Sequence, residues 1–342
     1  MSVNVTQTSF NSKSKLEENK QKYGLKGKAI VESDTVVEVR ELAGLGRKNL
    51  IINGDFRVWQ RGTTFTINNK ITADRWKFYR DVSGSATSTS DGLRLEKTLG
   101  TNSWSFIGQV MESIDTQHLN GKTITMSAKV KGETINKVRL YIGVEPGEDN
   151  SQALTAPDYL FTKIFDISTD EFTKISFTVT LPKLATDFTL GAAVDLRNTF
   201  ATTDGDAVII KDVQIEEGAQ ATDFEFRHIG AEIELCERFY QKSYDLDTVP
   251  YSITEIGTVI ESGVRNDVNV THGVSFLTTM RAIPTMVAYS GLSGNGGKIH
   301  NNGDKVGVVG NIGHKGFDRI TITSGNAAVY AGYHYTADAE IY

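Results

Sequence analysis

The segment TITMSAKVKG, residues 123–132, alternates between apolar and polar side chains along its length. Its apolar positions are Ile124, Met126, Ala128 and Val130, and threonine, serine and lysine residues stand between them. Because successive side chains of a β-strand point to opposite faces, this period predicts a strand with one buried and one wet face. Such strands are typical of antiparallel sheets, so the segment favours an all-β protein.

Neighbouring segments repeat this alternation. KVRLYIGV occupies residues 137–144 and KISFTVTLP occupies residues 174–182, while ADRWKFY, TLGAAVDL and AVIIKDVQIEEG are further strand-like segments. The chain has 32 glycines and 5 prolines, and this excess of glycine indicates tight turns between short strands. Residues 49–228 are therefore expected to form a jelly-roll β-sandwich of roughly eight or more strands, without convincing helices.

DFRVW, residues 55–59, is expected to be the first strand of this sandwich. Phe56 and Val58 share one face, and Arg57 and Trp59 share the other. The Asn-Gly pair just before the segment is typical of a tight turn, and we interpret it as the start of the strand rather than as a ligand loop. We expect Trp59 to pack against the sandwich or against the neighbouring N-terminal arm.

The period changes in IGAEIELCERFYQK, residues 229–242. Ile229, Ile233, Cys236 and Tyr240 recur at a spacing that predicts a short amphipathic helix. Its apolar stripe could pack on its own domain or on copies of itself around a symmetry axis. Shorter, glycine-rich strand patterns follow, so residues 243–342 are expected to form a second small β domain.

Residues 1–48 differ from the rest of the chain. Six lysines lie between Lys13 and Lys28, against two glutamates, and an acidic segment follows at once. This segment has too little apolar surface to fold alone. We interpret it as an extended attachment arm, with simple disorder as the alternative.

Charge and composition exclude several classes of protein. The net charge of -6 argues against binding to nucleic acid, whose phosphates attract basic surfaces. One cysteine, Cys236, allows no internal disulfide. The sequence has no run of 18 apolar residues and no apolar leader at its N-terminus, so we expect no membrane insertion and assembly in a cytoplasm.

Three groups of segments, taken in order, resemble phage virion appendage proteins of the tail-fibre and head-fibre class. The first is NLIINGDFRVWQRG followed by ADRWKFYR, the second is VIIKDVQIEEGAQATDFEFRHIGAEIELCERFYQK, and the third is VSFLTTMRAIPTMVAYS with the terminal YHYTADAEIY. The resemblance covers residue 49 to the end. Residues 1–48 match no part of it, which leaves open whether the chain attaches to a tail or to a capsid.

The resemblance implies a carbohydrate-binding-like jelly roll followed by a small C-terminal β domain, commonly assembled as a homotrimer. It implies a place on the virion after assembly in the host cytoplasm, with residues 1–48 contacting other virion proteins. A glycan or another receptor on the host surface would be the partner. The alternatives are a capsid-attached head fibre or decoration protein, a small glycan depolymerase, and the binding module of a secreted carbohydrate-active enzyme.

The sequence offers little catalytic machinery, and we expect no enzyme and no catalytic residues. Nucleophile-elbow, zinc-protease and phosphate-loop motifs are missing from it. The carboxylate pairs Asp204 with Asp206 and Asp245 with Asp247 lie in turn-like sequence, where solvated aspartates are ordinary. A depolymerase would need a pair set across a groove.

Metal and cofactor sites are weakly indicated. The six histidines lack zinc-like spacing, but in a trimer His314 or His334 could supply one nitrogen per chain to an axial ion. Sandwiches of the resembled kind often hold a structural calcium ion, and Asp55 and Asp212 are the carboxylates best placed for it. The alternative is that Asp55 is a turn residue and Asp212 a surface strand residue. No cofactor is expected.

Sugar recognition needs exposed aromatic rings beside hydrogen-bonding groups. The sandwich offers Trp76, Tyr79, Trp104 and Tyr141, with Arg139 on the same strand face as Tyr141. Packing in the core is the alternative for each ring. An exposed C-terminal loop is the second candidate region, because distal loops often carry recognition; its polar residues are Asn295, His300, Asn301, Asn302 and Asp304.

Overall fold

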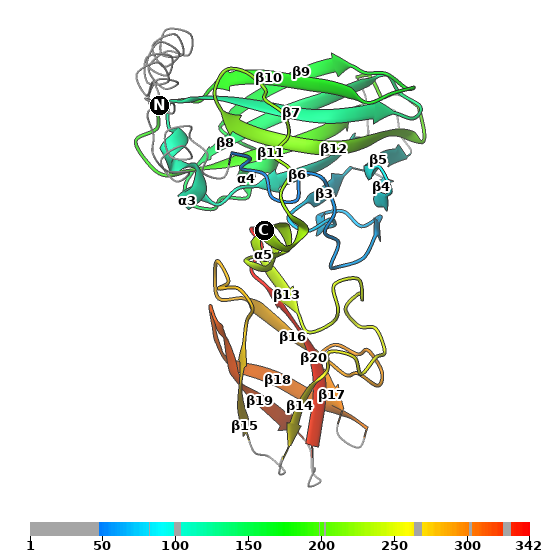
Figure 1. Cartoon of the computed structure of the whole chain (residues 1–342), viewed down its shortest axis with the longest axis vertical. Coiled ribbons are helices and arrows are strands. Elements are labelled where there is room, and N and C mark those ends of the chain that lie inside the picture. The colour runs from blue at the N-terminus through cyan, green and yellow to red at the C-terminus, as the bar shows by residue number, and fades with distance from the viewer. Residues whose placement is uncertain are drawn as a thin grey trace, which may run out of the picture. The chain divides into compact units, whose positions relative to one another are not determined.

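The computed structural model describes residues 48–81, 83–98, 104–197, 199–201, 203–262, 269–300, 303–323 and 330–342 (Figure 1). Residues Leu50–Tyr342 form one compact unit. The predicted attachment arm lies outside the described residues, except for Lys48. None of the helices in the described ranges is long and apolar enough to cross a membrane.

The sandwich consists of two antiparallel sheets, as the alternation predicts. The first has the order β1 (Thr64–Phe65), β4 (Ser83–Thr89), β5 (Gly92–Thr98), β12 (Asp206–Glu217), β7 (Thr123–Gly132) and β10 (Thr173–Thr180). The second has the order β2 (Lys70–Ile71), β3 (Lys77–Arg80), β6 (Trp104–Val110), β11 (Phe188–Arg197), β8 (Lys137–Pro146) and β9 (Tyr159–Asp166).

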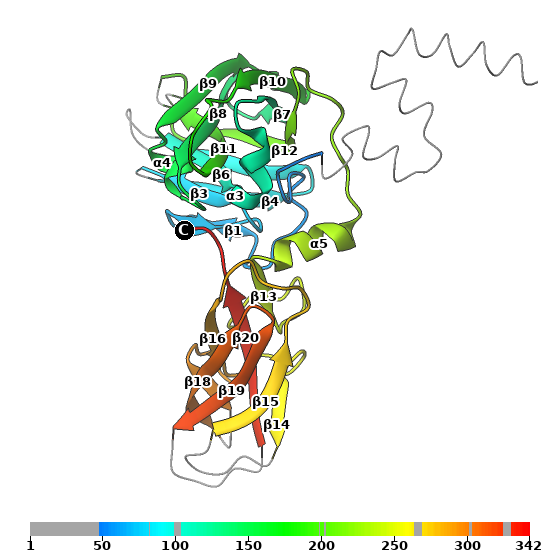
Figure 2. The same ribbon diagram turned by 90° about the vertical axis from the view of Figure 1, so that its left-hand side faces the viewer.

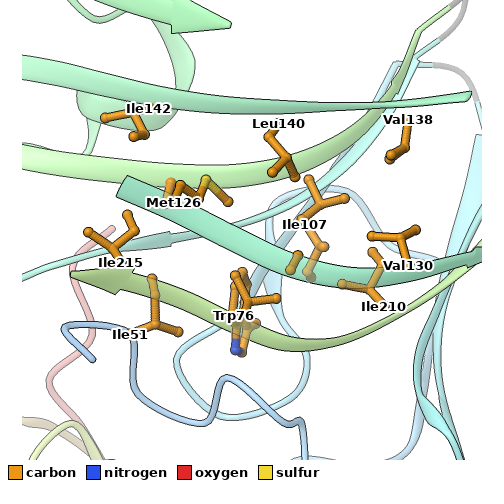
Figure 3. Packing of buried hydrophobic residues seen from close by; sticks show 14 of the residues in the cluster. Ile51, Trp76, Ile107, Met126, Val130, Val138, Leu140, Ile142, Ile210 and Ile215 are labelled. Atoms are coloured by element: carbon orange, nitrogen blue, oxygen red, sulfur yellow. The ribbon is translucent and has the colours of Figure 1, made fainter. Parts of the chain in front are cut away.

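The core lies between these sheets and is built from alternate residues of their strands. Ile124, Met126, Ala128 and Val130 of β7 are at most 1% exposed, and so are the apolar residues of β8 that face them across the sandwich. Figure 3 shows Met126 and Val130 near Val138, Leu140 and Ile142 in this layer. The predicted all-β sandwich is confirmed, because the apolar residues that alternate along these strands are the ones that are buried.

The opening stretch does not form the predicted first strand. Asn53 and Phe56 both have positive φ angles, of 56° and 59°, which a strand cannot contain. Asn53 is fully buried, donates from Nδ2 to the Val58 carbonyl (2.9 Å) and accepts from the Val58 amide (3.0 Å). The stretch is thus an irregular segment, which the Asn53 side chain holds in place through hydrogen bonds. Trp59 packs against the sandwich core, as expected.

Short helices also occur in the connections of the sandwich. They are α3 (Ser113–Thr116), the 3-10 helix η1 (Gln117–Leu119) and α4 (Gln152–Thr155). Each is too short to show a helical period in the sequence. The helix α4 lies in the connection between β8 and β9 and packs on the outer face of the second sheet.

The predicted helix at 229–242 is shorter than expected. The helix α5 spans Ile229–Glu237, and Tyr240–Lys242 forms the strand β13. The change follows from pairing, because Tyr240 and Lys242 stand opposite Asp338 and Thr336 of β20 (Tyr330–Asp338). Part of the apolar stripe of α5 packs on its own chain, since Cys236 belongs to a cluster on the outer face of the second sheet.

The C-terminal residues form a third sheet (Figure 2). Strand β20 pairs with β13, β16 (Thr285–Tyr289), β14 (Val259–Ser262) and β17 (Lys298–His300). On its other side β17 pairs with β18 (Asp304–Gly313), β18 pairs with β19 (Gly316–Thr323), and β19 pairs with β15 (Asn269–Ser275). Tyr333 and Ile299, both 0% exposed, belong to a separate small core.

Candidate functional site

Strand register brings four of the predicted residues onto one outer surface of the second sheet. Arg139 of β8 stands opposite Asp195 of β11, Asp195 opposite Phe106 of β6, and Phe106 opposite Tyr79 of β3. Trp104 and Tyr141 lie two residues along their strands from members of this row, so they share its face. Their chain neighbours Phe78, Leu140 and Val194 point the other way, into the sandwich core.

The aromatic rings of this surface stack in a chain. Ring centroids are 4.6 Å apart between Tyr79 and Phe106, and 5.3 Å apart between Phe106 and Trp104. Tyr141 meets Phe106 edge-on at 5.9 Å and donates its hydroxyl hydrogen bond to the Leu154 carbonyl. Burial raises the pKa of Tyr79 to about 12, and it also raises the pKa of Tyr141. Both phenols therefore stay neutral at pH 7.

A buried carboxylate organises the charged part of the surface. The Asp195 side chain is 0% exposed and accepts from Arg139 Nε (3.0 Å), Arg139 Nη2 (2.5 Å) and Arg197 Nε (3.2 Å). Burial raises the pKa of Asp195, while the two arginines oppose that rise. The Arg197 guanidinium lies 5.5 Å from the Trp104 ring centroid. Asp195 thus fixes two donor groups beside one aromatic ring.

Much of this surface is covered by other parts of the chain. A Cβ added at Gly143 would lie 2.0 Å from the Ala153 carbonyl oxygen, and one at Gly191 would lie 2.4 Å from it. The helix α4 therefore packs directly on a glycine-lined strip of the sheet. Cys236 and Phe239, from α5 and the turn after it, join the cluster that contains Tyr79 and Tyr141.

What remains accessible we call the open face. Trp104 is partly exposed, the Arg139 and Arg197 side chains are 18% and 31% exposed, and Ile164 of β9, opposite Arg139, is 49% exposed. The open face consists of Trp104, Lys137, Arg139, Ile164 and Arg197, and the buried Asp195 pairs with its two arginines. The open face presents one ring, an apolar neighbour and fixed cationic donors, a combination suited to a ligand with both apolar faces and hydrogen-bonding groups.

Three of the predicted sugar-contacting rings are not available to a ligand. Trp76 is 0% exposed, lies 4.8 Å from Phe56 and donates from Nε1 to the Asn53 carbonyl (2.8 Å). Tyr79 is 7% exposed and Tyr141 is 2% exposed. The alternative interpretation, packing, holds for these rings: Trp76 fills the core, and the two tyrosines lie beneath the open face. Sequence reasoning missed Asp195 and Arg197, although Asp195 lies in the strand-like segment TLGAAVDL and Arg197 follows it directly.

The C-terminal loop candidates do not join this surface. His300 belongs to β17 and is 5% exposed, because its ring packs against Gly332. It is a buried strand residue rather than an exposed loop residue. Asn301 and Asn302 lie outside the described residues. Asp304 accepts hydrogen bonds from Ser290 (2.6 Å) and Ser293 (2.5 Å), which lower its pKa, and it also accepts one from Asn295 (3.3 Å).

The two carboxylates predicted for calcium do lie near each other. Asp55 and Asp212 line one pocket of about 360 Å³. Each already has a cationic partner, since Arg57 Nε lies 2.5 Å from Asp55 and Lys129 Nζ lies 2.7 Å from Asp212. Calcium takes six to eight oxygens, and two carboxylates neutralised by two cations are a poor fit for it. The described residues contain no group of three or more histidine, cysteine or acidic side chains arranged for a metal.

The predicted axial histidines differ in their surroundings. His334 is 0% exposed, its Nε2 donates to the Thr254 carbonyl (3.0 Å) and its Nδ1 lies 3.0 Å from the Ser243 hydroxyl. Both ring nitrogens are engaged, so His334 is a core residue and not a metal ligand. His314 is exposed, with Nδ1 3.1 Å from the Met280 carbonyl oxygen.

No family model and no curated protein matches the chain. Similar solved structures include "CBM4 structure and function", with 14% identity, a TM-score of 0.32, and coverage of 48% of this chain and 98% of that one. A putative sugar binding protein from Bacteroides thetaiotaomicron VPI-5482 has 16% identity, a TM-score of 0.30, and coverage of 50% and 100%. The enzymatically active domain of tailspike protein 4 of bacteriophage CBA120 has 10% identity, a TM-score of 0.29, and coverage of 50% and 21%. At these identities and TM-scores the likenesses establish neither a family nor a function.

Proposed function

We propose that this chain is a subunit of a phage virion fibre or appendage and that its sandwich binds a glycan on the host surface. One observation carries the glycan proposal: the partly exposed Trp104 ring lies beside Arg139 and Arg197, which Asp195 holds in place. An aromatic face can pack against the C–H face of a pyranose, and the guanidinium groups can donate to its hydroxyls or carboxylate. Phe106 stacks with the Trp104 ring, and Tyr79 and Tyr141 in turn contact Phe106.

The virion role is supported by the sequence resemblance from residue 49 to the end and by the lysine-rich segment before it. In this proposal residues 1–48 attach the subunit to other virion proteins, and three chains assemble into one fibre. Mass measurement in solution tests the assembly, and a clean monomer at micromolar concentration would contradict the trimer. Deleting residues 1–48 and asking whether the protein still sediments with tails or with empty heads separates tail from capsid attachment.

Tryptophan fluorescence during titration with host-surface glycans tests the binding proposal. The chain has three tryptophans, and Trp76 is fully buried, so a ligand-dependent change reports on Trp59 and Trp104. We expect a saturable change that persists in Trp59→Phe and disappears in Trp104→Phe. If no glycan from the host surface gives saturation, the proposal fails.

A further inference from the structure

A second concave site lies beside the C-terminal β domain, within the compact unit Leu50–Tyr342. It is a pocket of about 750 Å³, bounded on one side by the segment 61–71 and on the other by side chains of β16, β20 and the loop before β14. Pockets that bind small ligands commonly have volumes of about 300–1,000 Å³ and lie where two domains meet. The pocket shares no residue with the open face.

Exposed tyrosines give this pocket its aromatic lining. Tyr251 and Tyr342 are each 61% exposed, and the Tyr251 ring centroid lies 6.4 Å from that of half-buried Tyr289. Tyr251 has a φ of 65°, in the left-handed region that a bulky residue rarely adopts. A Cβ at Gly294 would lie 2.0 Å from the Tyr251 carbonyl oxygen, so Gly294 lets the loop close around it. The backbone thus holds an exposed ring at the pocket at a cost in strain.

Arg61 and Asp338, two of the charged residues that line the pocket, are already paired, and Lys70 also lines it. Arg61 contacts Asp74 (3.0 Å), Glu340 (3.2 Å) and Asp338 (3.5 Å), and its guanidinium lies 3.6 Å from the Tyr240 ring centroid. With three carboxylates around it, Arg61 presents no free positive charge to a ligand. Asp338 also accepts from the Tyr342 hydroxyl at 2.7 Å. Arg61 is therefore not available to bind an anionic ligand.

Hydrogen-bonding side chains complete the lining. Asn69 lies on the sandwich side, and Thr285 and Thr336 lie on the side of the C-terminal domain. A wholly apolar ligand would displace water from Asp338 and the threonines without replacing the hydrogen bonds that the water makes, and this is unfavourable. A ligand with flat C–H faces and many hydroxyls would match both the rings and the polar groups.

We propose that this pocket is a second binding site, which takes a short neutral oligosaccharide. Tyr251 and Tyr289 contact the sugar faces, and Asn69, Thr285 and Asp338 bond the hydroxyls. The site is independent of the open face, whose arginines suit a glycan that carries acidic groups.

Titration of the full chain with a panel of neutral trisaccharides of glucose, galactose, mannose and xylose tests this inference, with a uronic acid trisaccharide as the charged comparison. We expect at least one neutral member to bind. Tyr251→Gly should weaken that binding about tenfold, because it removes the ring and adopts a positive φ without strain. Thr285→Val removes one hydroxyl at nearly constant shape and should weaken binding by a smaller factor.

Trp104→Phe is the matched control, since it alters the open face and should leave binding in this pocket unchanged. The inference is overturned if no neutral trisaccharide binds at millimolar concentration, or if Tyr251→Gly and Thr285→Val leave the affinity unchanged. Loss of neutral sugar binding in Trp104→Phe alone would place the sugar on the open face and likewise contradict the second site. Failure of the open-face proposal would instead appear as a Trp104 variant that still binds the host glycan normally.

Discussion

Arg75 and Glu340 form an ion pair with side chains that are only 3% and 1% exposed. Arg75 lies between β2 and β3 of the sandwich, and Glu340 follows β20 near the C-terminal end. The Arg75 guanidinium also donates to the Val110 carbonyl at 2.6 Å and lies 3.4 Å from the Phe239 ring centroid. The C-terminal tail is thereby joined to the sandwich.

Glu340→Gln is expected to destabilise the protein strongly. It leaves Arg75 buried without its carboxylate, and removing one partner of a buried pair costs about 3–5 kcal/mol. The free energy of unfolding in urea measures this loss. Glu217→Gln is the matched control, because its pair with Lys122 is about half exposed and is worth about 0–1 kcal/mol. Equal effects of the two substitutions would contradict the role of the buried pair.

Gly143→Ala is expected to displace α4 from the sheet. Its new Cβ would lie 2.0 Å from the Ala153 carbonyl oxygen, and overpacking of this kind costs about 1–3 kcal/mol. The Tyr141 hydroxyl, which donates to Leu154 of α4, would then gain solvent. Thermal unfolding and solvent quenching of tyrosine fluorescence measure both effects. Gly273→Ala, with no atom within 4 Å of the added Cβ, should change neither.

Stability is expected to fall as the pH drops below about 6.5, in part because of His334. Burial lowers the pKa of His334 below its ordinary value of 6.5, so the folded state keeps a neutral ring where the unfolded chain takes up a proton. This contribution is fully present above pH 6.5 and is lost as the pH falls. Urea unfolding at pH 7.5 and 5.5 should show a larger loss of the free energy of unfolding in the natural chain than in His334→Gln. The same pH dependence in both would be evidence against this assignment.

Calcium is expected to leave the melting temperature unchanged. Arg57 and Lys129 already neutralise Asp55 and Asp212, so a divalent cation would have to displace them. Thermal melts with excess calcium and with a chelator measure this. A rise of several degrees with calcium that is lost in Asp55→Asn would show that the two carboxylates do hold the ion.

The sequence predicts the sandwich well because burial on one face of a strand leaves a period-2 pattern. β7, β8 and β10 carry that pattern, and the structure has them as strands. The stretch DFRVW carries it too, but its alternation reflects an irregular segment in which Phe56 and Val58 are both buried. Local pattern alone cannot separate these cases, since Asn53 holds the segment through hydrogen bonds to residues further along the chain.

The candidate site is only partly predictable from sequence. Alternation places Arg139 and Tyr141 on one strand face, yet it does not say that α4 covers the tyrosine. The pairing of Arg139 with Asp195, 56 residues apart, depends on strand register, which no local pattern encodes. For the same reason the pocket beside Tyr251 was missed, because its two sides come from segments far apart in the chain.

In the proposed function, the open face binds a host glycan through Trp104. Isothermal titration of the full chain and of Trp104→Ala with the purified host-surface glycan tests this binding most directly. Tyr159→Ala is the control. Tyr159 is a 39% exposed ring on β9 that points away from the open face, because it alternates with the outward-facing Leu160. We predict that Trp104→Ala raises the Kd at least about tenfold, which is about 1.4 kcal/mol, with the fold retained, and that Tyr159→Ala leaves the Kd unchanged. An unchanged Kd in Trp104→Ala would contradict the claim.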